Sequence, residues 1–206
     1  MEAVNSVMSP AMPARKIDID PASRNFEIPN IIAEPIRLAG IIEDSIVDGP
    51  GVRFVIFVQG CPHNCEGCHN QDAQDFNGGF SADIYKIADK IIKSGTKRLT
   101  FSGGEPFCHA RELAKIAWLI ESEKRGVEII TYTGYLYEEL LEMAKTDMDI
   151  RELLTVTNYL VDGKFEQDKK TLDWFYRGSY NQRIFDITCY PNSAKARLIE
   201  RREDLR

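Results

Sequence analysis

The sequence lacks several features that would place it in other protein classes. No apolar run approaches the roughly 18 residues that a membrane span needs, and the longest, residues 54–58, has the length of a strand. Basic residues are not in excess, since 26 Lys and Arg stand against 32 Asp and Glu, a net charge of −6. We therefore expect no membrane association and no direct nucleic-acid ligand. Residues 1–30 contain no apolar signal region, so a cytoplasmic location is expected.

Cysteine is also scarce, and its distribution is informative. The chain has five cysteines, of which three, Cys61, Cys65 and Cys68, fall within one short segment. This clustering argues against a disulfide framework and for a metal site, because thiols in the cytoplasm stay reduced and free for a metal. Cys108 and Cys189 are far from the cluster, and we expect them to be small structural hydrophobes.

The apolar pattern predicts strands alternating with helices over most of the chain. The predicted strands are residues 36–42 (an edge strand), 52–58, 98–101, 127–132, 158–161 and 184–189. The predicted helices are residues 81–93, with Ser81 as the cap, 109–124 and 136–144. Such alternation indicates an α/β fold with right-handed βαβ units and a parallel sheet. Five or six strands favour a partial, open parallel β/α barrel over a complete eight-stranded one.

The chain length of 206 residues indicates one domain with tails. We expect residues 1–35 to be an N-terminal extension, residues 36–190 the domain, and residues 191–206 a C-terminal tail that ends as a solvated helix. Glycine-rich or polar segments follow four of the predicted strands, at residues 60–70, 102–106, 133–135 and 162–164. Ligands of parallel sheets bind beyond the carboxyl ends of the strands, so these four segments are predicted to form one site.

Three kinds of centre are compatible with the cysteine segment. A structural zinc needs four ligands, and His63 or His69 would have to complete the set. A closed ferredoxin-type cluster needs four cysteines, commonly with two residues between successive ligands. The spacing here is three residues and then two, with no fourth cysteine nearby. It therefore favours a [4Fe–4S] cluster with three protein ligands and one iron open to a small molecule.

The Cys-x3-Cys-x2-Cys spacing after a predicted strand resembles the signature of the radical S-adenosylmethionine superfamily. The segment SGGEP at residues 102–106 resembles the second motif of that superfamily. A finer resemblance is to the activating proteins of the anaerobic (class III) ribonucleotide reductase. It rests on DGPGVR (48–53), YTGY (132–135), LVDGKF (160–165) and RGSYNQ (177–182), and it covers roughly residues 36–187.

The resemblance implies a [4Fe–4S] cluster on Cys61, Cys65 and Cys68, with the open iron bound by S-adenosyl-L-methionine. One electron would break the S–C5′ bond, and the 5′-deoxyadenosyl radical would abstract hydrogen from a glycine of the reductase. A flavodoxin- or ferredoxin-type reductant is implied as well. No residue is assigned a catalytic role beyond these cofactors. The implied S-adenosylmethionine contacts are Gly67, Cys68 and His69 near the adenine, Gly103, Gly104 and Glu105 near the methionine ammonium, Thr133 near the ribose, and Asp162 and Lys164 near the ribose or carboxylate.

Other functions remain open at this point. One is the activation of a different glycyl-radical enzyme, such as pyruvate formate-lyase, and another is small-molecule chemistry of the carboxy-deazaguanine synthase kind. A non-catalytic iron–sulfur electron carrier and a zinc-stabilised binding module belong to other classes. The segment 177–182 favours the reductase as partner, because it is the feature most specific to that group of activating proteins.

Overall fold

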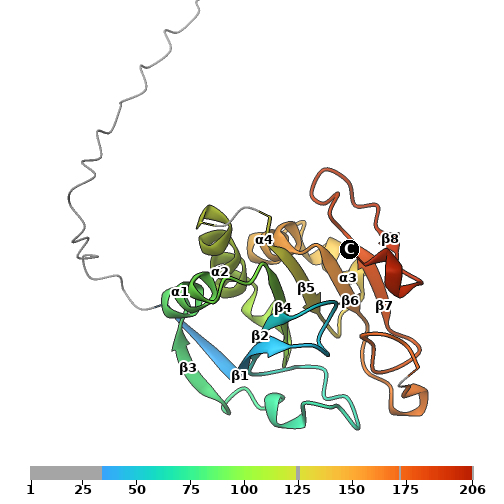
Figure 1. The fold of residues 1–206 in the computed structure, drawn as a ribbon. Coiled ribbons are helices and arrows are strands. Elements are labelled where there is room, and N and C mark those ends of the chain that lie inside the picture. The colour runs from blue at the N-terminus through green and yellow to red at the C-terminus, as the bar shows by residue number, and fades with distance from the viewer. Residues whose placement is uncertain (1–33, 124–125, 172, 206) are drawn as a thin grey trace, which may run out of the picture. The chain divides into compact units, whose positions relative to one another are not determined.

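The computed structural model describes residues 34–123, 126–171 and 173–205 (Figure 1). The predicted N-terminal extension, residues 1–35, lies outside this part of the chain apart from its last two positions. The described strands form one open sheet in the order β3-β1-β2-β4-β5-β6-β7-β8. Their bounds are β1 Pro35–Ser45, β2 Arg53–Val58, β3 Phe80–Asp83, β4 Arg98–Gly103, β5 Glu128–Tyr132, β6 Tyr159–Asp162, β7 Arg183–Asp186 and β8 Arg197–Leu198.

The centre of the sheet is parallel and its flanks are antiparallel. Strands β2, β4, β5 and β6 run in one direction, with Val58 opposite Gly103 and Tyr132 opposite Val161. Strands β1, β3, β7 and β8 pair antiparallel with their neighbours. The α/β class is confirmed, but the expected five or six parallel strands are wrong in number and direction. The hairpin connections β1–β2 and β7–β8 are too short for the crossovers that parallel pairing needs.

Two predicted elements differ from the structure in detail. Strand β1 is internal, because residues 80–83 fold back as β3 and take the edge position. Residues 81–83 therefore belong to a strand, and the helix begins after them with Asp83, not Ser81, as its cap. The Asp83 carboxylate accepts a hydrogen bond from the amide of Tyr85 at 2.9 Å, which satisfies one of the free amides of the first turn.

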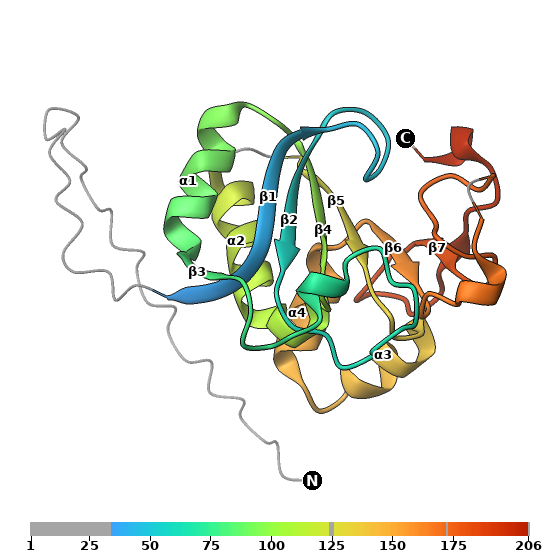
Figure 2. The ribbon, with the colours of Figure 1, turned by 90° about the horizontal axis from the view of Figure 1, so that it is seen from below.

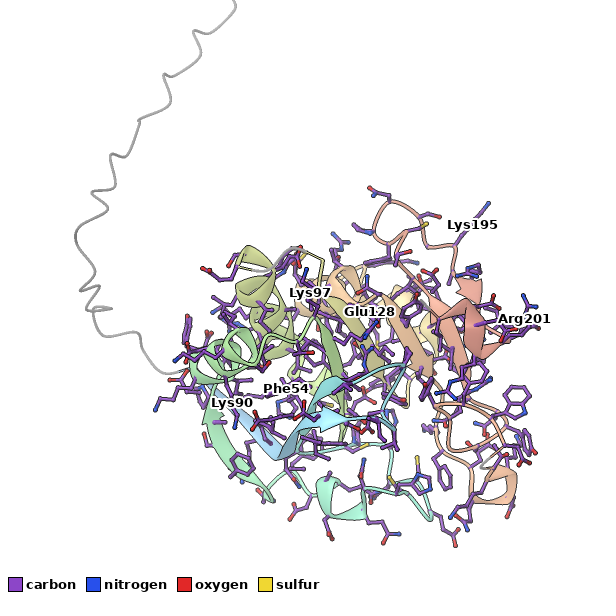
Figure 3. All side chains as sticks on the ribbon, in the orientation of Figure 1. Phe54, Lys90, Lys97, Glu128, Lys195 and Arg201 are labelled. Atoms are coloured by element: carbon purple, nitrogen blue, oxygen red, sulfur yellow. The ribbon has the colours of Figure 1, made fainter. Side chains whose placement is uncertain are left out.

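The helices are α1 Ile84–Ser94, α2 Ala110–Glu123, α3 Tyr137–Met143 and α4 Met148–Val156. Helix α4 was not among the predicted elements; the Asp147 side chain caps it. Helices α1 and α2 lie side by side in both ribbon views (Figures 1 and 2). All four helices pack with Phe54, Leu99 and other strand residues in one buried cluster (Phe54 is labelled in Figure 3).

The strands alternate between two buried clusters, as the two-residue period of a strand requires. Ile129 and Leu160 belong to the cluster under the helices, whereas Ile130 and Val161 face the other cluster. Residues from the C-terminal tail cover this second face: Ile199 is fully buried and Leu205 is 8% exposed. The expectation of a solvated helix end is therefore wrong, because residues 197–198 pair with β7 as a strand.

Candidate metal centre

The segments that follow the four parallel strands line one cavity of about 110 Å³ at the carboxyl edge of the sheet. Each of the four predicted segments contributes to its wall, so the prediction that they meet is confirmed. The lining residues are Cys61, His63, Cys65 and Cys68 after β2, Ser102 to Glu105 around the end of β4, Tyr132 to Gly134 around the end of β5, Gly163 and Phe165 after β6, and Gln74 and Gln182.

Backbone hydrogen bonds close the cysteine segment into a loop. The amide of Gly60 donates to the carbonyl of Ala73 at 2.8 Å, and that of Cys61 donates to Gln74 at 3.0 Å. The amide of Asn70 donates to the sulfur of Cys68 at 3.4 Å. A short loop closed at its base holds its side chains in place, and here it directs the three cysteines to the same cavity.

The three thiols are only partly exposed. Burial raises the pKa of the Cys61 thiol to about 11 and raises the pKa of Cys65 as well. A hydrogen bond from the Phe165 backbone amide and the positive charge of Lys164 lower the pKa of Cys65 in opposition to burial. Thiols with raised pKa values are protonated at neutral pH, so a metal centre that binds them as thiolates must displace protons.

The three cysteines share the wall of one cavity, and soft thiolates in such a set fit an iron–sulfur cluster. In the ranges that the structure describes, no three or more His, Cys, Asp or Glu side chains gather closely enough to hold a single metal ion.

Glu105 ties three of the four segments together. Its carboxylate is fully buried and accepts hydrogen bonds from the Phe107 amide at 3.0 Å, the Thr133 hydroxyl at 2.8 Å and the Gly134 amide at 2.8 Å. His63 belongs to the cysteine loop, and its Nε2 lies 2.9 Å from Oε2 of Glu105, the oxygen that also accepts from Gly134. The His63 side chain is 6% exposed. A buried carboxylate with this many partners orders its surroundings, so Glu105 links the cysteine loop to the ends of β4 and β5.

The two glycines at the end of β4 lie where the backbone is crowded. A Cβ on Gly104 would lie 2.3 Å from the carbonyl oxygen of Gly60, and a Cβ on Gly103 would lie 2.5 Å from the amide nitrogen of Val58. Both clashes are with backbone atoms, which cannot move aside. These positions therefore require glycine, because the end of β4 packs directly on the end of β2 and on the loop that follows β2.

Four predicted cofactor residues lie outside the walls of this cavity. Both oxygens of the buried Asp162 accept from Arg183, and one also accepts from the Tyr137 amide at 2.7 Å. Lys164 is exposed near Cys65, and Gly67 lies against the side chain of Gln167. The fourth, His69, lines a neighbouring cavity.

That neighbouring cavity measures about 530 Å³ and shares Cys68 and Gly103 with the first. Its other walls come from β1, the end of β2 and residues 69–73. The smaller cavity is below the usual 300–1,000 Å³ of a small-molecule site, whereas the larger one falls within that range. The two cavities together therefore offer room for an organic cofactor beside the cysteines.

Several lining residues had no cluster or cofactor role among the predictions from the sequence: His63, Gln74, Gly163, Phe165 and Gln182. Four of them lie within or next to segments that had been singled out as motifs, so their position in those motifs was the available signal. Nothing in the sequence marks Gln74, whose amide donates to the carbonyl of Cys65 at 3.4 Å. The pairing of His63 with Glu105 spans 42 residues and has no local pattern.

Comparison with known proteins agrees with this geometry. Residues 47–185 match the family model described as a 4Fe-4S single cluster domain. The chain is 36% identical over 155 residues to the anaerobic ribonucleoside-triphosphate reductase-activating protein of Pasteurella multocida, which covers 70% of this chain and 94% of that protein.

Two further relatives carry the same description. The Escherichia coli K12 protein is 36% identical over 149 residues, with 69% of this chain and 93% of that protein covered. The protein of Enterobacteria phage T4 is 32% identical over 147 residues, with 69% and 88% covered. Of the helices that the structure describes, none has the length and apolar character of a membrane span. The chain belongs to the family of anaerobic ribonucleoside-triphosphate reductase-activating proteins.

Proposed function

We propose that this protein activates an anaerobic ribonucleoside-triphosphate reductase by reductive cleavage of S-adenosyl-L-methionine. The observation that carries the proposal is the meeting of three cysteines and a glycine pair in one cavity at the carboxyl edge of the sheet, in a chain whose relatives are named for that activation. Cys61, Cys65 and Cys68 would hold a [4Fe–4S] cluster. When bound, the reduced cluster supplies the electron that cleaves S-adenosylmethionine to methionine and a 5′-deoxyadenosyl radical, which takes a hydrogen atom from a glycine of the reductase.

The protein's own residues bind and orient the cofactor in this proposal. The amide of Gly104 donates to the Val58 carbonyl at 2.7 Å and that of Glu105 donates to the Gly60 carbonyl at 2.8 Å. A methionine ammonium donates hydrogen bonds, so the groups of the 103–105 segment proposed to bind it are backbone carbonyls. The Glu105 carbonyl also accepts from the amide of Cys108 at 3.0 Å. Glu105 acts in the proposal by ordering that segment, because its carboxylate is already surrounded by hydrogen-bond donors.

The residues proposed for the adenine, ribose and carboxylate of S-adenosylmethionine lie near the same carboxyl edge of the sheet. Gly67, Cys68 and His69 are proposed to face the adenine, since Cys68 and His69 line the larger cavity. Thr133 and Lys164 are proposed for the ribose or carboxylate side, and Lys164 also brings positive charge to Cys65. Asp162 is proposed to serve the same side by fixing the end of β6 through Arg183.

The finer fold and the setting of the reaction are part of the proposal. We propose the open, partial β/α barrel of radical S-adenosylmethionine enzymes, and its support is a sheet that begins at β3, ends at β8 and has four parallel central strands. The substrate is the glycine-bearing region of the reductase, which an open sheet leaves room to approach. A flavodoxin- or ferredoxin-type donor supplies the electron, and we propose a cytoplasmic location.

Anaerobic reconstitution with iron and sulfide tests the chemistry. The expected result is a brown protein with about four irons per chain, which forms 5′-deoxyadenosine from S-adenosylmethionine when reduced. A colourless protein that takes up zinc in preference to iron would contradict the proposal. So would a stable cluster that transfers electrons without cleaving S-adenosylmethionine, because that behaviour is typical of an electron carrier.

A further inference from the structure

One loop beside the cysteine cavity has no role in the proposed function. It is the segment 166–182 between β6 and β7 (orange in Figure 1), in which Lys170 and Ser179 pair as an antiparallel bridge. Phe165, just before this hairpin, and Gln182, at its end, both line the cysteine cavity. Both ends of the 166–182 hairpin therefore lie at the site to which the reductase would have to bring its glycine.

The hairpin concentrates buried polar atoms that lack a hydrogen-bond partner. Among the residues that the structure describes, four side-chain atoms are buried without one, and three of the four belong to residues 176–181: Tyr176 Oη, Arg177 Nε and Asn181 Oδ1, beside Tyr137 Oη elsewhere. Unpaired buried donors and acceptors are costly, and folded proteins contain few of them. Their concentration here indicates a segment whose hydrogen bonding is incomplete in the free protein.

Arg177 is the clearest case, because it is a buried cation without a carboxylate partner. It is 8% exposed, and its one hydrogen bond with the described residues runs from Nη1 to the Gln182 carbonyl at 3.4 Å. Burial lowers the pKa of Arg177, and no carboxylate of the described residues opposes that shift. Arg53 and Arg183, by contrast, each pair with a carboxylate. Since buried charges are normally paired, Arg177 retains N–H groups for an acceptor from outside the chain.

Two exposed aromatic side chains complete the surface around this arginine. The guanidinium of Arg177 lies 3.9 Å from the centroid of the Trp174 ring, and Tyr180 meets the same ring edge-on, with centroids 5.7 Å apart. Trp174 is 42% exposed and Tyr180 is 49% exposed. Trp, Tyr and Arg are the residue types most enriched among those that dominate the binding energy of protein interfaces. The combination therefore favours a protein as the partner of this surface.

We propose that Trp174, Arg177 and Tyr180 form a docking surface for the reductase, in which the two rings pack on an apolar side chain and Arg177 pairs with a carboxylate of the reductase. This assignment rests on the proposed function, since that function requires the reductase to reach the cysteine cavity. A carboxylate is the expected acceptor, because Arg177 is a cation with no carboxylate of its own among the described residues. Docking at the hairpin places the reductase beside the cavity that Phe165 and Gln182 line.

Trp174→Ala tests the docking surface, with Trp118→Ala as the matched control. Trp118 is the only other tryptophan of the chain, is 46% exposed, and donates from its indole to Glu152 at 3.0 Å, between helices α2 and α4. In Trp174→Ala we expect the Kd for the reductase to rise about 10- to 30-fold, as for the loss of an interface hot spot. Iron content and dithionite-driven formation of 5′-deoxyadenosine without the reductase should match wild type. Trp118→Ala should match wild type in every measurement.

Arg177→Gln tests the carboxylate pairing separately. We expect a raised Kd for the reductase and a weaker dependence of that Kd on salt concentration than in wild type, because salt screens the attraction between opposite charges. Dithionite-driven cleavage of S-adenosylmethionine without the reductase should again match wild type. A salt dependence equal to that of wild type would overturn the pairing of Arg177 with a carboxylate.

Hydrogen exchange of the wild-type protein tests the same surface without a substitution. When the reductase is added to the reconstituted protein, we expect amide exchange at residues 173–181 to slow about tenfold and exchange in α2 to stay unchanged. A wild-type Kd in Trp174→Ala, or an unprotected hairpin in the complex, would overturn the docking surface. So would a Trp174→Ala protein that binds the reductase normally and loses only flavodoxin-driven cleavage, because the hairpin would then serve the electron donor. A wild-type protein that does not cleave S-adenosylmethionine would refute the proposed function itself, so the two failures are distinguishable.

Discussion

Each end of the parallel strands holds a buried pair of polar side chains, and the two pairs differ in their surroundings. At the amino ends, Arg53 of β2 meets Glu128 of β5 at 2.6 Å (Glu128 is labelled in Figure 3). At the carboxyl ends, His63 meets Glu105 at 2.9 Å. Arg53, Glu105 and His63 are almost completely buried, and Glu128 is 21% exposed.

The guanidinium of Arg53 donates its hydrogen bonds to other groups of the fold. It donates to the Thr100 hydroxyl at 2.8 Å and to the carbonyls of Pro50 and Leu99, as well as to Glu128. Burial lowers the pKa of Arg53 while the Glu128 contact raises it. These contacts anchor the DGPGVR segment between β1 and β2, so that motif has a structural role in this protein.

The Glu105 pair instead lies in the wall of the cysteine cavity. It joins the cysteine loop to the ends of β4 and β5, the segments proposed to bind the cofactor. We therefore expect the pair at the amino edge of the sheet to stabilise the fold and the pair at the carboxyl edge to order the site, as is usual for the two ends of parallel strands. The changes below separate these two roles.

Loss of a cluster ligand should have the largest effect. Cys65→Ala removes one of three thiolates from the cavity, and we expect loss of the cluster and of 5′-deoxyadenosine formation. Cys108→Ala is the matched control, because Cys108 is exposed and does not line the cavity. Iron analysis and product assay measure both variants. Activity that survives in Cys65→Ala would show that the assignment of this ligand is wrong.

Glu105→Gln should have the next largest effect. The glutamine amide places an N–H group where the carboxylate accepts hydrogen bonds from His63, Thr133 and Gly134. We expect the rate of S-adenosylmethionine cleavage to fall 10- to 100-fold. Glu200→Gln, at an exposed position, should leave the rate unchanged. Wild-type rates in Glu105→Gln would show that the two edges of the sheet do not differ in role.

Arg53→Met should change stability and leave the site intact. Removal of one partner of a buried pair costs about 3 kcal/mol of unfolding free energy, the lower end of the usual range, because Glu128 is partly exposed. Denaturant unfolding measures the loss, and Arg53→Met with Glu128→Leu should recover part of it. Iron content and cleavage rate per folded molecule should equal those of wild type. A lower rate in the folded variant would show that Arg53 affects the site as well as stability.

The exposed pair of Glu138 and Arg183 should contribute least to the free energy of unfolding. Glu138 accepts from Arg183, and this contact holds the pKa of Glu138 below its ordinary value of 4.5. A carboxylate with a lowered pKa stabilises the fold above its unfolded pKa, and the contribution disappears as the pH falls through the folded pKa. We expect Glu138→Gln to cost at most about 0.5 kcal/mol at pH 7 and nothing once the pH lies below the folded pKa of Glu138. A larger cost at pH 7 would show that this pair behaves as a buried one.

Much of the fold follows from local patterns in the sequence. The buried run at residues 54–58 predicted β2, and helical spacing predicted α1 to α3, because each such segment buries one face or both. The edge position of β3, the Asp83 cap and the antiparallel β8 depend on which strand is available to pair, and local pattern does not contain that information. The tail illustrates the point, since Ile199 is buried by residues distant in sequence.

At the site, too, some features were predictable from the sequence and others were not. The position of four polar or glycine-rich segments after predicted parallel strands predicted which segments meet, and all four line the cavity. The partners of Glu105 and Asp162 were not predictable, because Gly134 and Arg183 lie 29 and 21 residues away. Both carboxylates were expected at the cofactor, and both are hydrogen-bonded within the fold.

We propose that residues at the carboxyl edge of the sheet support the generation of a radical on a partner protein. The most direct test is electron paramagnetic resonance of the anaerobic ribonucleoside-triphosphate reductase after incubation with the reconstituted, reduced protein and S-adenosylmethionine. We expect a glycyl-radical signal on the reductase that requires S-adenosylmethionine and is absent with Cys65→Ala. A signal on pyruvate formate-lyase but none on the reductase would contradict it.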